Sequence, residues 1–254
     1  MTRERTWVRN LTIAASLVLG AIAWQVAGRF TSDAFWAPLS STLASLVGVV
    51  KSGVLLRQAA SSFELYLTGL ALAVAVGAPL GMLLARVAWL RVALEDYIAM
   101  LYATPMVALI PFILSIMGFG FAPKVLVVFL FAVFPVLYNT IEGARSIRPE
   151  LIEVAHSFRS REWRLWCDVL IPYTLPFMMT GVRQAIARGL VGMVAAEFFL
   201  SPSGLGQMIM MGSQNFDTAG MLAAILIIVL LGVGLMDLGR YLERRFAPWR
   251  SYRP

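Results

Sequence analysis

Long apolar runs, most of them free of charged side chains, dominate this chain and restrict what it can fold into. A helix needs about 20 apolar residues to cross the hydrocarbon core of a bilayer. In that environment each segment must satisfy its own backbone polar groups, and runs of this length do so as helices. The sequence therefore predicts an all-α integral membrane protein with about six transmembrane helices, at 10–28, 65–85, 97–123, 125–141, 169–196 and 218–236.

The composition supports this class and excludes others. Hydrophobic residues make up 59% of the chain and charged residues only 14%, whereas soluble domains carry about 25% charged residues. The net charge of +7 comes from arginines at the ends of apolar runs, a placement that controls membrane topology, so no nucleic-acid partner is expected. With one cysteine, Cys167, and one histidine, His156, we expect no intrachain disulfide, no metal site and no catalytic centre. The 254 residues suit one transmembrane domain, 1–254.

A further charge-free run, at 34–50, contains Pro38 and several hydroxyl residues. We interpret the segment at about 34–53 as an interfacial amphipathic helix rather than a seventh span. With six spans and an inner amino terminus, 15 arginines lie on the inner side and four cationic residues on the outer side. The positive-inside rule thus predicts both termini in the cytoplasm. A cleavable signal peptide ending near Ala21-Ile22-Ala23 is the alternative for the first run, although that run stays apolar to Gly28.

A charged segment, 142–168, separates the fourth and fifth runs. Pro149 suits the first position of a helix, in which four residues would share one face: Leu151, Val154, Ala155 and Phe158. Ser160 is a plausible N-cap for a second helix, with one face made of Trp163, Trp166 and Val169. Physical reasoning leaves two explanations open: a docking site for a cytoplasmic partner, or a loop whose arginines contact anionic lipid headgroups.

Glu153-x-Ala155, followed by Val169-Leu170-Ile171-Pro172, resembles the EAA loop of the permease subunits of ABC importers. Similar stretches continue elsewhere, at 70–84, 101–111, 181–198, 203–206 and 215–218. They resemble the subgroup that imports nitrate, sulfonates, taurine and bicarbonate. The resemblance implies the type I importer permease fold, with coupling helices between spans four and five. It also implies a set of ATPase-coupling residues: Glu153, Ala155, His156, Phe158, Arg159 and Pro172.

One position departs from the family pattern. Glycine usually stands six positions after the glutamate of this loop, and here that position is Arg159. Glycine would permit a left-handed bend that arginine adopts at a cost of roughly 1 kcal/mol. Either Ser160 caps the second helix and the bend relaxes, or the ATPase partner carries a matching acidic contact.

The chain has no P-loop of its own. Its two lysines, Lys51 and Lys124, follow Val50 and Pro123 instead of glycine. The resemblance therefore implies that ATP and magnesium are used by a separate cytoplasmic ATPase subunit and that this chain binds no cofactor. It further implies an external substrate-binding protein, a second permease copy in a homodimer, and the bacterial inner membrane.

The resemblance implies a small, anionic transported solute, and two alternatives stay open. The same machinery could import a vitamin precursor of the pyrimidine or riboflavin type. A stand-alone secondary transporter would need internal repeats, and the two halves of the chain show no convincing one. An intramembrane enzyme would need dyads or metal ligands at mid-membrane depth, which the sequence lacks.

Arg183 and Arg188 lie inside the fifth run, where charge is expensive and usually functional. They could line an anion path, snorkel to the interface, or pair with a carboxylate such as Glu197. In the third run, Pro105 and Pro111 predict a kinked helix. The predicted translocation path comprises Tyr102, Thr104, Met106 and Arg188, and the predicted gate comprises Gly204, Gly206, Met208 and Met211. The methionines could equally be ordinary packing residues. Glu95 and Asp96 are expected to pair with Arg86, Arg91 or the arginines of the loop.

Overall fold

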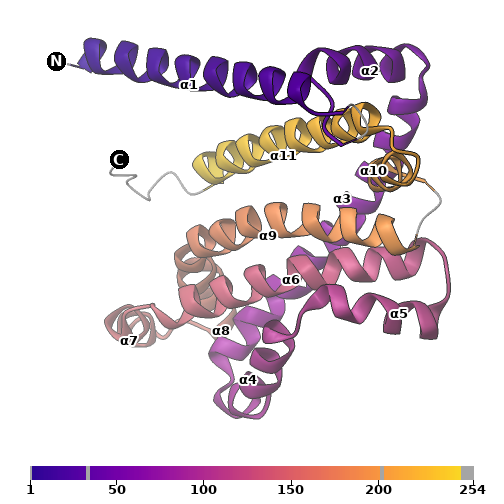
Figure 1. Ribbon diagram of the computed structural model, residues 1–254. Coiled ribbons are helices and arrows are strands. Elements are labelled where there is room, and N and C mark those ends of the chain that lie inside the picture. Colours follow the sequence, from indigo (N-terminus) through magenta and orange to yellow (C-terminus); the bar gives the residue numbers. More distant parts are fainter. Residues whose placement is uncertain (1, 33–34, 201–202, 247–254) are drawn as a thin grey trace. The chain divides into compact units, whose positions relative to one another are not determined.

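The computed structural model describes residues 2–32, 35–200 and 203–246, and within these ranges it contains helices and connections but no strand. The helices are α1 (Thr2–Phe30), α2 (Leu39–Lys51), α3 (Val54–Arg86), α4 (Ala88–Ala103), η1 (Met106–Leu109), α5 (Ile110–Met117), α6 (Phe121–Arg145), α7 (Pro149–Ser157), α8 (Glu162–Arg164), η2 (Leu165–Leu170), α9 (Ile171–Leu200), α10 (Leu205–Gln214) and α11 (Thr218–Phe246) (Figure 1). The all-α prediction is confirmed.

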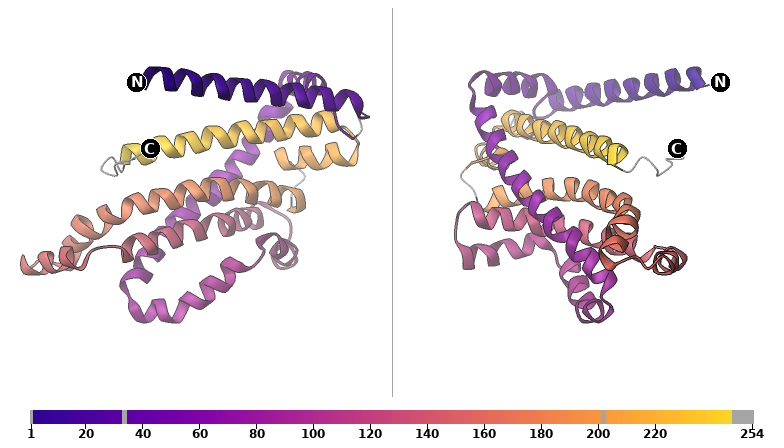
Figure 2. Two further views of the ribbon diagram at one scale, coloured as in Figure 1. Left: turned by 60° about the vertical axis from the view of Figure 1, so that its left-hand side comes forward. Right: turned by 180° about the vertical axis from the view of Figure 1, so that it is seen from behind.

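Five of these helical stretches are long and apolar enough to cross a membrane, and a sixth crossing requires α4 and the η1–α5 segment to count together. The kink that Pro105 and Pro111 predict in the 97–123 run is present as a break between two helical segments, which meet at an angle of 91° (Figure 2). Thr104 is extended, with ψ at 132°, because Pro105 disfavours the helical conformation in the residue before it. The third predicted span is therefore a bent pair of helices.

The predicted short helix near 34–53 corresponds to α2, whose 13 residues begin directly after Pro38. It is tied to α1 by polar contacts. The indole of Trp24 donates to the Ala37 carbonyl (3.1 Å), and Gln25 exchanges hydrogen bonds with Ser40. A helix of 13 residues is too short to cross the hydrocarbon core, which agrees with six crossings. Its position at the interface stays a prediction.

The contacts of the chain form two compact units, one made of 1–60 and 203–229 and the other of 61–202 and 230–254. The second unit holds the packed centre of α3, α6 and α9; Figure 1 shows α6 and α9 side by side. Small residues let these helices approach closely. A side chain on Gly81 of α3 would meet the Leu137 carbonyl of α6 at 2.9 Å, and one on Gly181 of α9 would meet the Pro135 carbonyl at 2.8 Å. Small residues are the usual means of close helix packing in membranes.

Candidate functional site

Helix α7 forms the first half of the predicted coupling loop. It begins with Pro149 at its first position, as predicted, and ends in a Schellman motif. In that motif the Arg159 N–H donates to the His156 carbonyl (2.8 Å) and the Ser160 N–H donates to the Ala155 carbonyl (3.0 Å). Arg159 has φ at +49°. The left-handed bend that glycine usually provides is therefore present here with arginine in its place.

The expectation that Ser160 caps a second helix is wrong. Arg161 occupies the N-cap position of α8, without a side-chain hydrogen bond. Ser160 is instead the residue that closes the Schellman motif of α7. The helix that starts at Glu162 continues without a break through the π-helical turn η2 into α9. The second half of the loop is thus the beginning of the fifth predicted span rather than a separate helix.

We expect Arg159→Gly to raise the free energy of unfolding by about 1 kcal/mol, because glycine adopts positive φ without a steric cost. The measurement is thermal unfolding of the purified protein in detergent. Arg161→Gly is the matched control, since Arg161 has φ at −67° and glycine brings no relief there. No gain in stability for Arg159→Gly would mean that the arginine side chain makes a compensating contact.

The faces of the loop differ from the predicted ones. Ala155 is buried against residues of α3 and η2, in a cluster with Met82, Ile147, Leu165 and Leu170. Val154 and Phe158, which were expected to share its face, are exposed, Phe158 by 82%. In the following segment Trp166 and Val169 pack on the same cluster, whereas Trp163 is 76% exposed. The period of the helix was predicted correctly, but the position of the buried stripe was not.

The remaining predicted coupling residues lie on or beside this loop. Glu153, His156 and Arg159 are exposed, and Pro172 is half-buried in the first turn of α9. Exposed aromatic side chains beside several arginines make a surface that the protein's own packing does not use. The structure thus places Glu153, His156, Phe158 and Arg159 at the surface and Ala155 under it.

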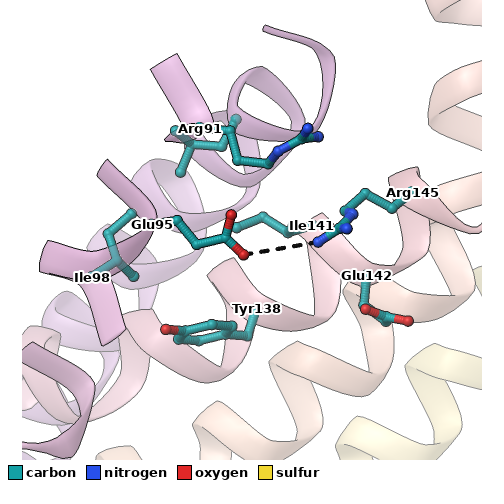
Figure 3. A pocket seen from close by; sticks show the side chains of 8 residues that line it. Arg91, Glu95, Ile98, Tyr138, Ile141, Glu142 and Arg145 are labelled. Carbon is teal, nitrogen blue, oxygen red and sulfur yellow. Dashed lines mark ion pairs between the residues drawn. The ribbon is translucent and has the colours of Figure 1, made fainter. Parts of the chain in front are cut away.

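Ion pairs brace the same end of the second unit. Arg86 of α3 binds Glu162 of α8 at 3.3 Å, and Arg145 of α6 lies 3.9 Å from Glu95 of α4. Figure 3 shows Glu95 pointing toward Arg145 in a pocket of about 210 Å³ that Arg91, Tyr138 and Glu142 also line. Of the partners that the sequence left open for Glu95, the structure pairs it with Arg145. For Arg86 the partner is Glu162.

The four predicted path residues line one cavity of about 220 Å³. They come from three elements: Tyr102 from α4, Thr104 and Met106 from the bend, and Arg188 from α9. The other lining residues are Pro105, Val107, Leu130, Phe131 and Phe134. The Arg188 guanidinium lies over the Tyr102 ring, 5.4 Å from its centroid, a cation–π contact. Among the residues that the structure describes, no carboxylate lines the cavity.

The two arginines of α9 have different surroundings. Arg183 binds the buried carboxylate of Glu243 on α11 at 3.3 Å. Arg188, by contrast, forms no ion pair within the part of the chain that the structure describes. Glu197, the partner considered for both, is buried and accepts a hydrogen bond of 2.6 Å from Ser62. Glu243 was missed because the sixth span was predicted to end at 236, whereas α11 continues to Phe246.

The predicted gate residues surround the start of α10. Gly204 has φ at +111° and its N–H donates to the Gln58 side chain at 2.7 Å, so this position requires glycine. Gly206 is buried, Met208 is half-buried and Met211 is 50% exposed. This arrangement fits a fixed turn that leads into a short helix. The role of these residues as a gate stays a prediction.

These features define a multi-spanning helical membrane protein with a charged loop between two of its spans and a cationic cavity between its helices. Residues 77–248 match the family model of the binding-protein-dependent transport system inner membrane component, and the chain belongs to this family, the permease subunits of ABC importers.

Three curated relatives illustrate the range of the family. The chain is 29% identical to the putative aliphatic sulfonates transport permease of Bacillus subtilis, over 96% of this chain and 88% of that protein. It is 30% identical to the taurine transport system permease of Escherichia coli, over 95% and 90%. It is 36% identical to the riboflavin transport system permease of Chloroflexus aurantiacus, over 66% of this chain and 62% of that protein's length.

Solved structures agree on the fold. The methionine ABC transporter MetNI in an inward-facing conformation aligns with a TM-score of 0.66 at 18% identity, over 76% of this chain and 96% of the other. An amino acid ABC transporter aligns with a TM-score of 0.60 at 17% identity, over 79% and 97%. The type I importer permease fold predicted from the sequence is confirmed.

Proposed function

We propose that this chain forms the translocation path of an ATP-driven importer for a small anionic solute of the nitrate, sulfonate, taurine or bicarbonate kind. The observation that carries this proposal is Arg188, an arginine inside the fifth span that faces a cavity whose described lining residues include no carboxylate. An arginine at membrane depth costs about 3 kcal/mol on insertion scales. Glu243 offsets that cost for Arg183, and a passing anion would offset it for Arg188.

The exposed loop face supports an ATPase partner. Phe158 and Trp163 are large apolar side chains at a polar end of the protein, beside Arg159 and Arg161. An apolar centre with charged neighbours is typical of a protein interface. In this proposal the ATPase subunits bind ATP and magnesium, this chain binds no cofactor, and closure of the ATPase moves the loops of two permease copies. The loop and both termini then lie on the cytoplasmic side of a bacterial inner membrane, as the arginine distribution predicts.

In the proposed cycle the loop transmits motion directly to the path. Because α8, η2 and α9 form one continuous helical stretch, a displacement of Glu162 is carried by the same stretch that bears Arg188. A substrate-binding protein on the outer side would deliver the solute to the opened cavity. ATP hydrolysis would then return the path to its inward-open state.

A second candidate solute is a vitamin precursor of the riboflavin type. Two observations favour it: the relative at 36% identity is a riboflavin permease, and Tyr102, Phe131 and Phe134 give the cavity aromatic walls. Aromatic walls would stack on a flat ring. A neutral solute of this kind would gain little binding free energy from the charge of Arg188. Substitution of this arginine therefore distinguishes the two candidate solutes.

We expect Arg188→Gln to lower uptake about tenfold, because a hydrogen bond to a charged group contributes about 1.5–3 kcal/mol. The assay is ATP-dependent uptake into proteoliposomes that hold the permease, its ATPase and its binding protein, with nitrate, bicarbonate, taurine, butanesulfonate and riboflavin as solutes. Arg188→Lys is the matched control and should keep more of the activity.

Three outcomes would contradict the proposal. Equal uptake of an anion by Arg188→Gln and wild type would remove the role of the arginine. Uptake of riboflavin alone, unchanged by the substitution, would establish the second candidate. Uptake by the permease without any ATPase would replace the importer with a stand-alone transporter.

A further inference from the structure

A pocket of about 210 Å³ lies between α3, α4 and α6, and the function proposed above makes no use of it. Its polar lining comes from two helices. Arg91 and Glu95 belong to α4, while Tyr138, Glu142 and Arg145 belong to α6 (Figure 3). A cavity of about 150 Å³ already holds a molecule of the size of benzene, so this pocket has room for a small solute or a lipid headgroup.

The charged groups of this pocket leave much of their hydrogen-bonding capacity unused. Arg145 and Glu95 form its only ion pair among the described residues, and the nearest atoms of the two are 3.9 Å apart. That distance exceeds the length of an N–H···O hydrogen bond, which is about 2.7–3.2 Å. Arg91 and Glu142 take part in no ion pair within the described ranges. Two cations and two carboxylates are therefore able to bind a ligand.

The mixed charge of the lining indicates which ligand fits. A simple anion would meet the two carboxylates as well as the two arginines, and a simple cation would meet the arginines as well as the carboxylates. Like charges at close range repel one another. A zwitterion, with an acidic group and an amine a few bonds apart, can instead pair each end with the opposite charge. Leu84, Ile98 and Ile141 supply apolar walls for the carbon atoms between the two ends.

The pocket and the path cavity are neighbours on the same two helices. On α4, Ile98 lines the pocket, and Tyr102, one helical turn further on, lines the path cavity. On α6, Tyr138 lines the pocket, and Phe134, one turn earlier, lines the path cavity. The Tyr102 and Tyr138 rings are in contact, with 5.1 Å between their centroids. A ligand that bridges α4 and α6 in the pocket would therefore hold together two walls of the path cavity.

We propose that this pocket binds a small zwitterion, whose acidic group contacts the two arginines and whose ammonium group contacts the two carboxylates. Two sources carry this chemistry: a free amino acid or aminosulfonate, and the headgroup of phosphatidylethanolamine. The bound zwitterion replaces the long contact between Arg145 and Glu95 with shorter hydrogen bonds and links α4 to α6. The inference goes beyond the proposed function, because it concerns binding at a site outside the path cavity and not transport.

The test measures the binding of two sulfonates to the full chain in nanodiscs by isothermal titration calorimetry. Taurine carries an amine, and isethionate carries a hydroxyl group in its place. The parent protein is Arg188→Gln, so that an anion in the path cavity contributes nothing to the signal. We expect taurine to bind about tenfold more tightly than isethionate, because a hydrogen bond between charged groups contributes roughly this factor. Glu95→Gln should reduce this preference to about twofold or less, because an amide offers the amine no charge.

Asp96→Asn is the matched control. Asp96 is the next residue of α4, is exposed and does not line the pocket, so this variant should keep the preference for taurine. Arg91→Gln gives a second test that breaks no ion pair, and it should weaken the binding of both sulfonates about tenfold. Equal affinities of the parent protein for the two sulfonates, an unchanged preference in Glu95→Gln, or an equal loss in Asp96→Asn would overturn the inference.

The lipid composition of the nanodiscs distinguishes the two sources. Taurine that binds more weakly when phosphatidylethanolamine is added to phosphatidylglycerol nanodiscs identifies the lipid headgroup as the occupant. Equal affinity in both membranes identifies a free solute. The outcome is independent of the uptake assay: anion uptake that Arg188→Gln leaves unaltered removes the proposed function, whereas a parent protein without preference for taurine removes only the zwitterion site.

Discussion

Replacing Arg183 by methionine should lower the free energy of unfolding by about 3 kcal/mol or more. Arg183 lies 3.3 Å from Glu243, whose side chain is only 6% exposed. Removal of one partner of a buried ion pair leaves the other charge buried, and this typically costs 3–5 kcal/mol. The loss should appear as a lower midpoint of chemical unfolding in detergent and as lower yield of folded protein.

Two controls give this prediction its specificity. The pair Arg240–Asp237 is 3.7 Å apart, and its side chains are 56% and 63% exposed, so Arg240→Met should change stability by less than about 1 kcal/mol. The double substitution Arg183→Met with Glu243→Leu should recover much of the lost free energy of unfolding. It also removes the buried carboxylate whose ion pair with Arg183 the single substitution breaks. Equal unfolding midpoints for Arg183→Met and Arg240→Met would mean that the buried pair contributes nothing to stability.

Gly181→Ala should destabilise the contact between α6 and α9 by about 2 kcal/mol, and Gly181→Val by more. A β-carbon at this position would lie 2.8 Å from the Pro135 carbonyl and 3.0 Å from the Val136 α-carbon. Both atoms belong to the backbone, so one helix must move, and overpacking of this kind costs about 1–3 kcal/mol. Thermal unfolding of the purified protein measures the effect.

Helix α9 supplies its own control for this substitution. At Gly189 the nearest atom to an added β-carbon is in the Tyr66 ring, at 3.4 Å, which is ordinary contact. Since alanine is favoured over glycine in a helix by about 1 kcal/mol, Gly189→Ala should be neutral or stabilising. A similar loss at both positions would show that general helix properties, rather than close packing, decide the result.

The candidate site could be predicted only in part from the sequence. The path residues Tyr102, Thr104, Met106 and Arg188 were named from the resemblance and from their polarity, and the structure brings them to one cavity. A kink at Pro105 was predicted, but not the full break that divides this span into two segments at 91°.

The loop shows a similar division. The sequence predicted the loop, its first helical residue and the departure from the family's glycine at Arg159. It did not predict the buried face: Ile152 and Ala155 turn toward the core while Val154 and Phe158 face outward. When apolar residues lie on several sides of a short helix, the elements that pack against it decide which face is buried. For α7 these elements are the end of α3 and η2.

The sequence by itself determined the membrane class, the approximate number of crossings and the charged loop, because transfer of a helix into lipid depends on local composition summed along the chain. It also determined that no P-loop is present. Only the tertiary structure decided which partners two arginines five residues apart contact. Helix α11 brings Glu243 to Arg183, while α4 brings the Tyr102 ring to Arg188. Which charge is neutralised depends on how the helices are rotated and packed against one another. Residues separated by 60 positions in the chain meet there through contacts that no local pattern encodes.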